Sequence, residues 1–320
     1  MKKLTAGIDV SKETLDISLY NGGKHDNITI ANDKKSFVKF LKKYSSDDLQ
    51  IVMEATGIYH LRIALEAHDL GYFVSVVNPL IIKRYGEMKM LRAKTDRVDA
   101  RLIAEYGYEQ SPKEFTPHSD DRMVLFQLLK AIEDLYKTRT EFRNRLESYT
   151  HGYPVSKEVG KTYRSMVQKI DREIERLKKK LQDSLDTHFP DQSSKLTSIK
   201  GVGKMTASMI MVFYGNFEQF ETAKQAVSFA GLNPHPRQSG TSVKRGSSIS
   251  KRGHALIRKT LYMSALSAKK HNPVYREYYE RLLASGKSKK VALVAVAHKL
   301  LRHIFAIVKY DREWDPQYAK

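Results

Sequence analysis

The first 115 residues combine the period-two alternation of strands with the wider spacing of helical stripes. Three strand patterns come first, and two more then alternate with helices that end near Tyr44 and Leu70. The expected strands are Leu4–Val10, Thr14–Tyr20, Lys24–Ala31, Leu49–Glu54 and Tyr72–Val77. A further helical pattern follows the last of them, so the order is βββαβαβα and predicts an α/β domain.

Four acidic residues stand out in this domain. The RNase H-like fold has the same element order and places its first and fourth strands side by side, so Asp9 and Glu54 would be neighbours. Asp96 and Asp99 are three residues apart, which puts them on one face of a helix. Asp9 interrupts an apolar strand, where a charge has no cheap structural reason to be. Four converging acids would repel one another unless a cation lay among them.

The chemistry of these acids indicates a divalent metal. Mg²⁺ prefers oxygen ligands, and a pair of such ions can hold both the attacking and the leaving oxygen of a phosphoryl transfer. We therefore expect Mg²⁺, or Mn²⁺ in its place, to be bound by Asp9, Glu54, Asp96 and Asp99. The simpler alternative is that Asp96 and Asp99 only form ion pairs with basic neighbours on the helix.

Residues from about 119 to 190 predict two long helices that fold back on each other. Apolar seams with alternating four-three spacing run over 128–149 and 163–181, and His151-Gly152-Tyr153-Pro154 makes the turn between them. A coiled-coil hairpin is expected, either as a structural spacer or as an arm with exposed basic faces. Such an arm would support a homo-oligomer, a dimer or tetramer, with nucleic acid along it.

Residues from about 191 to 320 predict a mainly α-helical domain. The stretch LTSIKGVGKMTA has the form of a helix-hairpin-helix, in which Gly201, Gly203 and Lys204 would meet a nucleic-acid phosphate. A plain glycine-containing turn between two helices is the alternative. A late apolar segment, 291–308, carries four basic or histidine side chains, so it predicts an amphipathic helix and not a membrane span.

A loop is expected over 233–253, because this stretch is rich in Ser, Gly, Arg and Lys and almost free of core-forming residues. One interpretation is a linker or a phosphate-binding surface. Another is that a serine attacks a DNA phosphate while basic side chains neutralise the developing charge. Those basic residues are Arg237, Lys244, Arg245, Lys251 and Arg252. The pattern alone does not choose among Ser239, Ser242, Ser247, Ser248 and Ser250.

Composition narrows the function classes further. The net charge is +20, with 56 Lys and Arg against 36 Asp and Glu, far more than solubility requires, which points to nucleic acid. There is no cysteine, which excludes disulfides, thiolate metal sites and a cysteine nucleophile. The P-loop spacing is not met, so an NTPase is disfavoured.

Several short motifs, read in order, resemble those of the DEDD-type insertion-sequence transposases. They are GIDVSK, EATGIY, KTDRVDA, SIKGVG, SFAGL and an SG that precedes ISKRG. One departure is the helix-hairpin turn, which commonly reads IPGIG in that family and here reads IKGVG, with Lys200 in place of proline.

The resemblance implies a RuvC-like catalytic domain (1–115), a coiled-coil hairpin (119–190) and a helical transposase domain with helix-hairpin-helix and serine loop (191–320). It makes the four acids a metal-binding catalytic tetrad and Ser239, the serine that precedes a glycine, the nucleophile. It also implies that the tetrad of one subunit and the serine of another build a composite site. One lineage of the family is guided by a bridge RNA from its own element.

The resulting hypothesis is a cytoplasmic, nucleoid-associated DNA recombinase that moves its own mobile element through a covalent phosphoserine–DNA intermediate, guided by a structured RNA. The nearest alternative is a Holliday-junction-resolving nuclease in which the same tetrad activates water. A non-catalytic nucleic-acid-binding scaffold is a third hypothesis, because charge and long helices need no active site.

Overall fold

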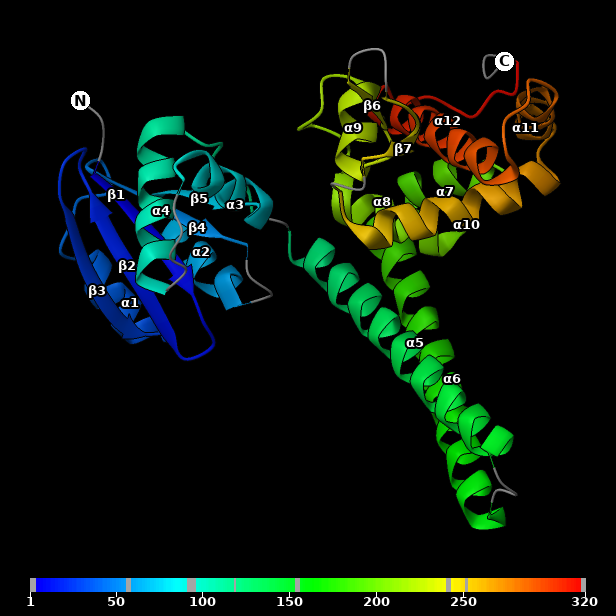
Figure 1. The fold of residues 1–320 in the computed structure, drawn as a ribbon, viewed down its shortest axis with the longest axis horizontal. Helices are drawn as coiled ribbons and strands as arrows, with labels where there is room; N and C mark the ends of the chain where they lie inside the picture. The colour runs from blue at the N-terminus through cyan, green and yellow to red at the C-terminus, as the bar shows by residue number, and fades with distance from the viewer. Residues whose placement is uncertain are drawn as a thin grey trace. The chain divides into compact units, whose positions relative to one another are not determined.

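The chain divides into two compact units, Met1–Pro117 and His118–Lys320 (Figure 1). The structure is a computed structural model that describes residues 4–55, 59–90, 96–117, 119–152, 156–239, 243–250 and 253–317. Within these ranges the side chains of 96–97, 152, 234–239 and 243–248 are not described.

The first unit is built on a five-stranded mixed sheet with the order β3-β2-β1-β4-β5. β1 pairs antiparallel with β2 and parallel with β4, so the expected adjacency of the first and fourth strands is confirmed. This topology is compatible with an RNase H-like domain. The strands are β1 (Leu4–Val10), β2 (Thr14–Tyr20), β3 (His25–Ala31), β4 (Leu49–Glu54) and β5 (Phe73–Val77).

Helices cover both faces of this sheet. Alternate residues of β1, including Ala6 and Ile8, are buried in one core with α1 (Lys34–Leu41) and α2 (Tyr59–Asp69). The opposite face carries α3 (Pro79–Met88) and α4 (Asp96–Gln110), where Val52 of β4 packs in a smaller core. The expected buried stripe Phe37, Phe40 and Leu41 of α1 is confirmed.

The second unit is mainly helical, with one core. Its helices are α5 (Asp120–Gly152), α6 (Lys157–His188), α7 (Pro190–Ser198), α8 (Lys204–Tyr214), α9 (Ala223–Ala230), α10 (Ala255–His271), α11 (Pro273–Ala284) and α12 (Lys289–Lys309). The core gathers apolar residues of α7–α12 and of those parts of α5 and α6 that lie closest to them. Ile174 and Gly160 of α6 are buried as well, outside this core.

Helices α5 and α6 lie side by side and reach away from the other helices of their unit (Figure 1). The rings of Phe142 and Tyr163 meet across them at 5.7 Å, and Arg139 donates to Asp171 at 2.8 Å. Arg139 of α5 therefore forms an ion pair with an acid from the opposite helix. Tyr149, near the end of the pair, is 52% exposed.

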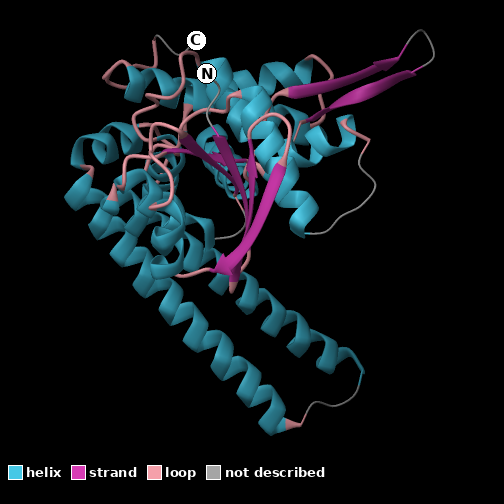
Figure 2. Ribbon diagram, turned by 90° about the vertical axis from the view of Figure 1, so that its left-hand side faces the viewer, coloured by secondary structure: helices cyan, strands magenta, loops and turns pink. Residues whose placement is uncertain are grey.

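The expected loop over 233–253 is wrong for most of its length. β6 (Pro234–Ser239) and β7 (Val243–Ile249) pair antiparallel, with an irregularity between His235 and Arg237 (Figure 2). Strand pairing is made by backbone groups, so it can form without the alternating apolar residues that make a strand recognisable in a sequence. Residues 240–242 and 251–252, including Lys251 and Arg252, lie outside the described residues.

Helix α12 is the one helix, among the residues that the structure describes, that is long and apolar enough to cross a membrane. Half of its apolar window is nevertheless buried inside the protein. Leu293, Leu300 and Ile304 belong to the core of the second unit, and α10 is its main neighbour. The expectation of an amphipathic helix with one buried face agrees with this packing.

Candidate active site

The register of the parallel strands brings two acids together. Ile8 of β1 pairs with Met53 of β4, so the next residues, Asp9 and Glu54, occupy neighbouring positions where both strands approach their carboxyl ends. Both side chains are half-buried. Because strand residues alternate in direction, Asp9 shares a face with Thr5 and Gly7. That is the face on which α4 packs.

Helix α4 touches β1 so closely that the strand needs a glycine. A Cβ on Gly7 would lie 2.6 Å from Cα of Ala104 and nearer still to the carbonyl oxygen of Ala100. At the far end of the helix, a Cβ on Gly107 would lie 2.9 Å from the methyl group of Thr5. The helix therefore runs antiparallel to β1, with backbone against backbone.

This arrangement predicts where the start of α4 lies relative to Asp9. Two further residues advance about 6.6 Å along β1, which equals four to five residues of a helix rising about 1.5 Å each. Counting back from Ala100 and Ala104 brings Asp9 level with the first turn of α4, which begins at Asp96 and includes Asp99. Asp99 is half-buried, and the side chain of Asp96 lies outside the described residues.

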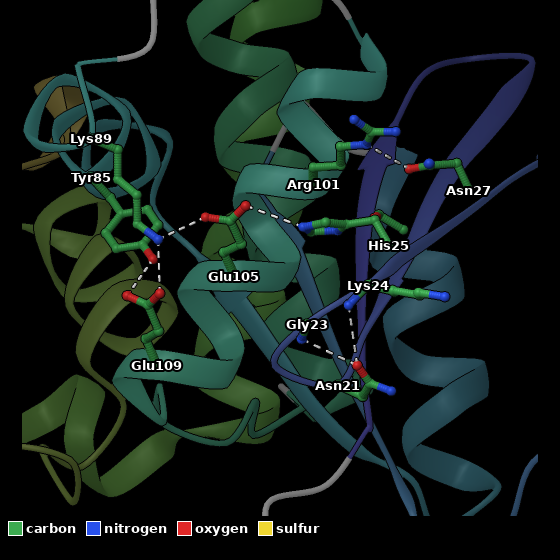
Figure 3. Close-up of polar contacts among 11 residues, drawn as sticks. Asn21, Gly23, Lys24, His25, Asn27, Tyr85, Lys89, Arg101, Glu105 and Glu109 are labelled. Carbon is green, nitrogen blue, oxygen red and sulfur yellow. Dashed lines mark hydrogen bonds and ion pairs between the residues drawn. The ribbon is translucent and has the colours of Figure 1, made fainter.

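A polar network on α4 fixes the helix to both of its neighbours (Figure 3). Glu105 lies 3.2 Å from Nε2 of His25 on β3 and accepts from Nζ of Lys89 at 2.7 Å. Lys89 also donates to Glu109 at 2.8 Å, and the hydroxyl of Tyr85 donates to the same carboxylate at 2.7 Å. These contacts join α4 to the sheet on one side and to α3 on the other.

Two pKa shifts in this network indicate that it is strong. Burial lowers the pKa of Lys89, but the hydrogen bonds to Glu105 and Glu109 outweigh it and raise that pKa above its ordinary value. Burial, and then the hydrogen bond to Glu109, raises the pKa of Tyr85 to about 12. Both groups keep their protons at neutral pH, so the network is complete there. The sequence pattern did not reveal it, because contacting members such as His25 and Glu105 lie 80 residues apart.

The donor set fits a hard divalent cation in its chemistry. Asp9 and Glu54 stand on paired strands and Asp99 on α4, and all three offer carboxylate oxygens. Among the described residues, no three His, Cys, Asp or Glu side chains lie close enough together to hold a metal ion. The fourth expected carboxylate, Asp96, is not among the described side chains.

The two glycines of the turn between α7 and α8 have different surroundings. Gly201 has φ +111°, and a Cβ there would lie 2.5 Å from Cα of Ala268, so its close approach is to α10. Gly203 precedes α8 and has open space where a Cβ would be. The ammonium of Lys204 is paired with Asp186, which a phosphate would have to displace.

The hairpin β6–β7 places the serine and basic positions in register. Ser239 pairs with Val243, Gln238 with Lys244, and Arg237 with Arg245. Ser239 is therefore two residues beyond a pair of arginine positions, at the tip of the ribbon. Of the expected basic residues, Arg237, Lys244 and Arg245 are on the hairpin strands.

Comparison with related proteins identifies the family to which the chain belongs. A family model described as "Transposase" (DEDD, IS110) matches residues 6–153, and one described as "Transposase IS116/IS110/IS902 family" matches residues 193–280. The chain is also 31% identical to a pilin gene-inverting protein of Moraxella lacunata over 98% of both chains. The chain belongs to the IS110 family of insertion-sequence transposases.

Two further relatives are less similar to the chain. The chain is 24% identical to the transposase for insertion sequence element IS1111A of Coxiella burnetii, over 75% of this chain and 72% of that protein. It is 22% identical to a probable family 20 transposase of Pseudomonas aeruginosa, over 97% and 98% of the two chains. The recognition of an insertion-sequence transposase from its motifs is therefore confirmed, and with it an enzyme that cleaves and rejoins DNA.

Proposed function

We propose that this IS110-family transposase cleaves and rejoins DNA at two groups of side chains, an acidic tetrad and the serine of the β6–β7 hairpin. The tetrad is Asp9, Glu54, Asp96 and Asp99, and the nucleophile is Ser239. The observation that supports the proposal is the pairing of β1 with β4, which makes Asp9 and Glu54 neighbours, together with the close packing of α4 on β1 at Gly7. The acids project from rigid elements, which suits a catalytic site.

The acidic residues would hold one or two divalent ions, with Mg²⁺ as the expected metal. When bound, the metal supplies a positive charge that stabilises negative charge building up on phosphoryl oxygens. The chain's own part is to keep the carboxylates at fixed positions. The Gly7 contact and the Lys89–Glu105–His25 network provide this by holding α4 against the sheet.

The hairpin serine would supply the covalent step. Oγ of Ser239 attacks the phosphorus of a DNA phosphodiester, an O–P bond forms, and the bond to one deoxyribose oxygen breaks. The serine proton is released, and the departing deoxyribose oxygen takes up a proton. Rejoining is the reverse reaction with the hydroxyl of another strand, so the number of ester bonds is conserved without ATP. Arg237 and Arg245, near Ser239 in the register, would neutralise the phosphoryl oxygens.

The proposal extends to assembly and guidance. The tetrad belongs to the unit Met1–Pro117 and the serine to the unit His118–Lys320, and we propose that a tetrad and a serine from different subunits build one site in a dimer or tetramer. We also propose that a structured RNA from the element guides the protein, acting on nucleoid DNA in the cytoplasm. This part rests on the motif resemblance and on the net charge of +20. The relation to a pilin gene-inverting protein suggests inversion as a second outcome of the same strand exchange.

The test is a cleavage assay with purified protein, Mg²⁺, DNA carrying the element ends, and RNA transcribed from its noncoding end. Products are separated on denaturing gels with and without protease treatment. We expect a protein-linked DNA strand that disappears in Ser239→Ala and persists in Ser248→Ala, a matched change on the opposite strand of the hairpin.

Two other outcomes would change the conclusion. Loss of the adduct in Ser248→Ala alone would move the nucleophile to another serine of the hairpin. Free cleaved ends that survive Ser239→Ala would make the protein a metal-dependent nuclease, and the phosphoserine step would be withdrawn.

A further inference from the structure

A pocket of about 680 Å³ lies between α9, α11 and α12, in the helical unit and on elements other than the β6–β7 hairpin. Its lining includes the basic side chains Arg281, Lys299 and Arg302, and also His298 and His303. Glu221 is the one acidic residue among its lining residues, all of which the structure describes. The family motifs and the serine chemistry make no use of this pocket.

The positive charges in the pocket are not balanced by acids. Among the described residues, no Asp or Glu forms an ion pair within 4.0 Å of Arg281, Lys299 or Arg302. Glu221 instead accepts from the side-chain amide of Gln225 at 3.5 Å. On the long helices α5 and α6, by contrast, a cation is paired, because Arg139 forms an ion pair with Asp171.

The cations also lie close to one another. Cζ of Arg281 is 5.3 Å and Nζ of Lys299 is 4.9 Å from the centre of the Tyr278 ring. Burial first, and then the charges of Arg281 and Arg302, lower the pKa of Lys299. Burial, and then Lys299 and Arg302, lower the pKa of His303 to about 4. The pocket therefore has a positive electrostatic potential, which a bound anion would reduce.

Helix α9 adds to this potential. Its N-cap, Thr222, and its first residue, Ala223, line the pocket, so the positive end of the helix dipole lies there. Two guanidinium groups, an ammonium and a helix N-terminus are the groups that proteins use to hold phosphate. A pocket of this volume accepts a phosphate together with part of its nucleotide.

We propose that this pocket binds a backbone phosphate of DNA through Arg281, Lys299 and Arg302, as a contact separate from the cleavage site. DNA is the polyanion on which the family acts, and a contact on α11 and α12 would orient it for the hairpin of the same unit. The inference rests on the proposed function only in that the chain binds DNA. It does not depend on which residue cleaves.

The first test measures binding without metal, so that no cleavage occurs. Affinity for a DNA duplex with the element end is determined by fluorescence anisotropy over a range of salt concentrations. The triple variant R281Q/K299Q/R302Q should bind roughly tenfold more weakly near 0.15 M salt, and its salt slope should fall by about 0.9 for each phosphate that the pocket no longer neutralises.

The matched control is K287Q/K289Q/K290Q, which removes three charges from exposed positions just before α12 and at its start, outside the pocket. It should change the salt slope by less than about 0.9, the value for a single neutralised phosphate. Equal falls in affinity for the two variants would overturn the proposal, because only general electrostatic attraction would then be at work. A triple variant that bound RNA of the same sequence more weakly while keeping its affinity for DNA would also overturn it.

The second test uses the unmodified chain, so it holds even if the triple variant does not fold. The pKa of His303 is followed by NMR with and without a short DNA duplex. A phosphate between Lys299 and Arg302 should raise that pKa, because it offsets the charges that lower it. A pKa that stayed unchanged at saturating DNA would refute a phosphate in the pocket. Both tests read binding alone, so failure of the Ser239 mechanism would leave their results intact.

Discussion

Replacing Gly7 by alanine should damage the active site without touching any acidic residue. The new Cβ would lie 2.6 Å from Cα of Ala104, and ordinary contacts of a Cβ begin at 3.4 Å, so α4 would have to move away by roughly 1 Å. The neighbouring atoms belong to the helix backbone, so no side chain can rotate to make room. Overpacking of this kind costs about 1–3 kcal/mol of unfolding free energy.

The catalytic effect should exceed the effect on stability. A displacement near 1 Å at a reacting centre can cost about a hundredfold in rate, and α4 carries two of the four proposed metal ligands. We expect metal-dependent cleavage by Gly7→Ala to fall by about that factor, while the melting temperature of the first unit falls by about 5 °C per kcal/mol.

The assay compares initial cleavage rates at a temperature well below the melting transition, with calorimetry on the same samples. Gly23→Ala is the matched control, because the nearest atom to its new Cβ, Oδ1 of Asn21, is 4.0 Å away. Wild-type cleavage by a folded Gly7→Ala variant would refute the placement of α4 against β1 as the device that positions the tetrad.

Three further changes test other parts of the molecule. Asp9→Asn and Glu54→Gln should each abolish cleavage in Mg²⁺, measured on gels, and should leave the affinity for DNA, measured by anisotropy, within about twofold of wild type. A variant that cleaved at the wild-type rate would show that the replaced acid is not part of the site. Gly201→Ala should lower the melting temperature of the second unit, because φ is +111° and the Cβ would meet Ala268, at a cost of about 1–3 kcal/mol; an unchanged melting temperature would contradict this packing. The unfolded chain binds more protons than the folded one between about pH 6.5 and pH 4, because the folded pKa of His303 is lowered to about 4. The contribution of His303 is therefore complete above pH 6.5 and is lost as pH falls to 4, by up to about 3 kcal/mol, so His303→Gln should flatten the fall in melting temperature over that range; parallel curves for the two proteins would show that His303 is not responsible.

The sequence by itself was sufficient for the local elements of the first unit. The apolar runs of Leu4–Val10 and Leu49–Glu54 predicted strands that the structure contains, and the RNase H-like order of elements predicted that these two strands are adjacent. These properties follow from nearby residues, since period and turn chemistry are local. The ordered motifs were sufficient for the family.

Contacts between residues that are far apart in the sequence were decided by the tertiary structure, because the pattern of apolar and polar residues contains no information on them. The need for glycine at position 7 depends on α4, which lies almost a hundred residues further along the chain. The hairpin β6–β7 was expected as a loop, because backbone pairing left no apolar alternation to recognise.

In the helical unit, the cationic pocket likewise forms only through tertiary packing. Glu221, Arg281 and Arg302 are scattered in the sequence, and each by itself is an ordinary charged surface residue. Periodicity predicts which face of a helix is buried, but the neighbour that covers this face is chosen by shape and volume throughout the core. The sequence therefore determined the elements and the chemical groups, and packing decided which of these groups meet.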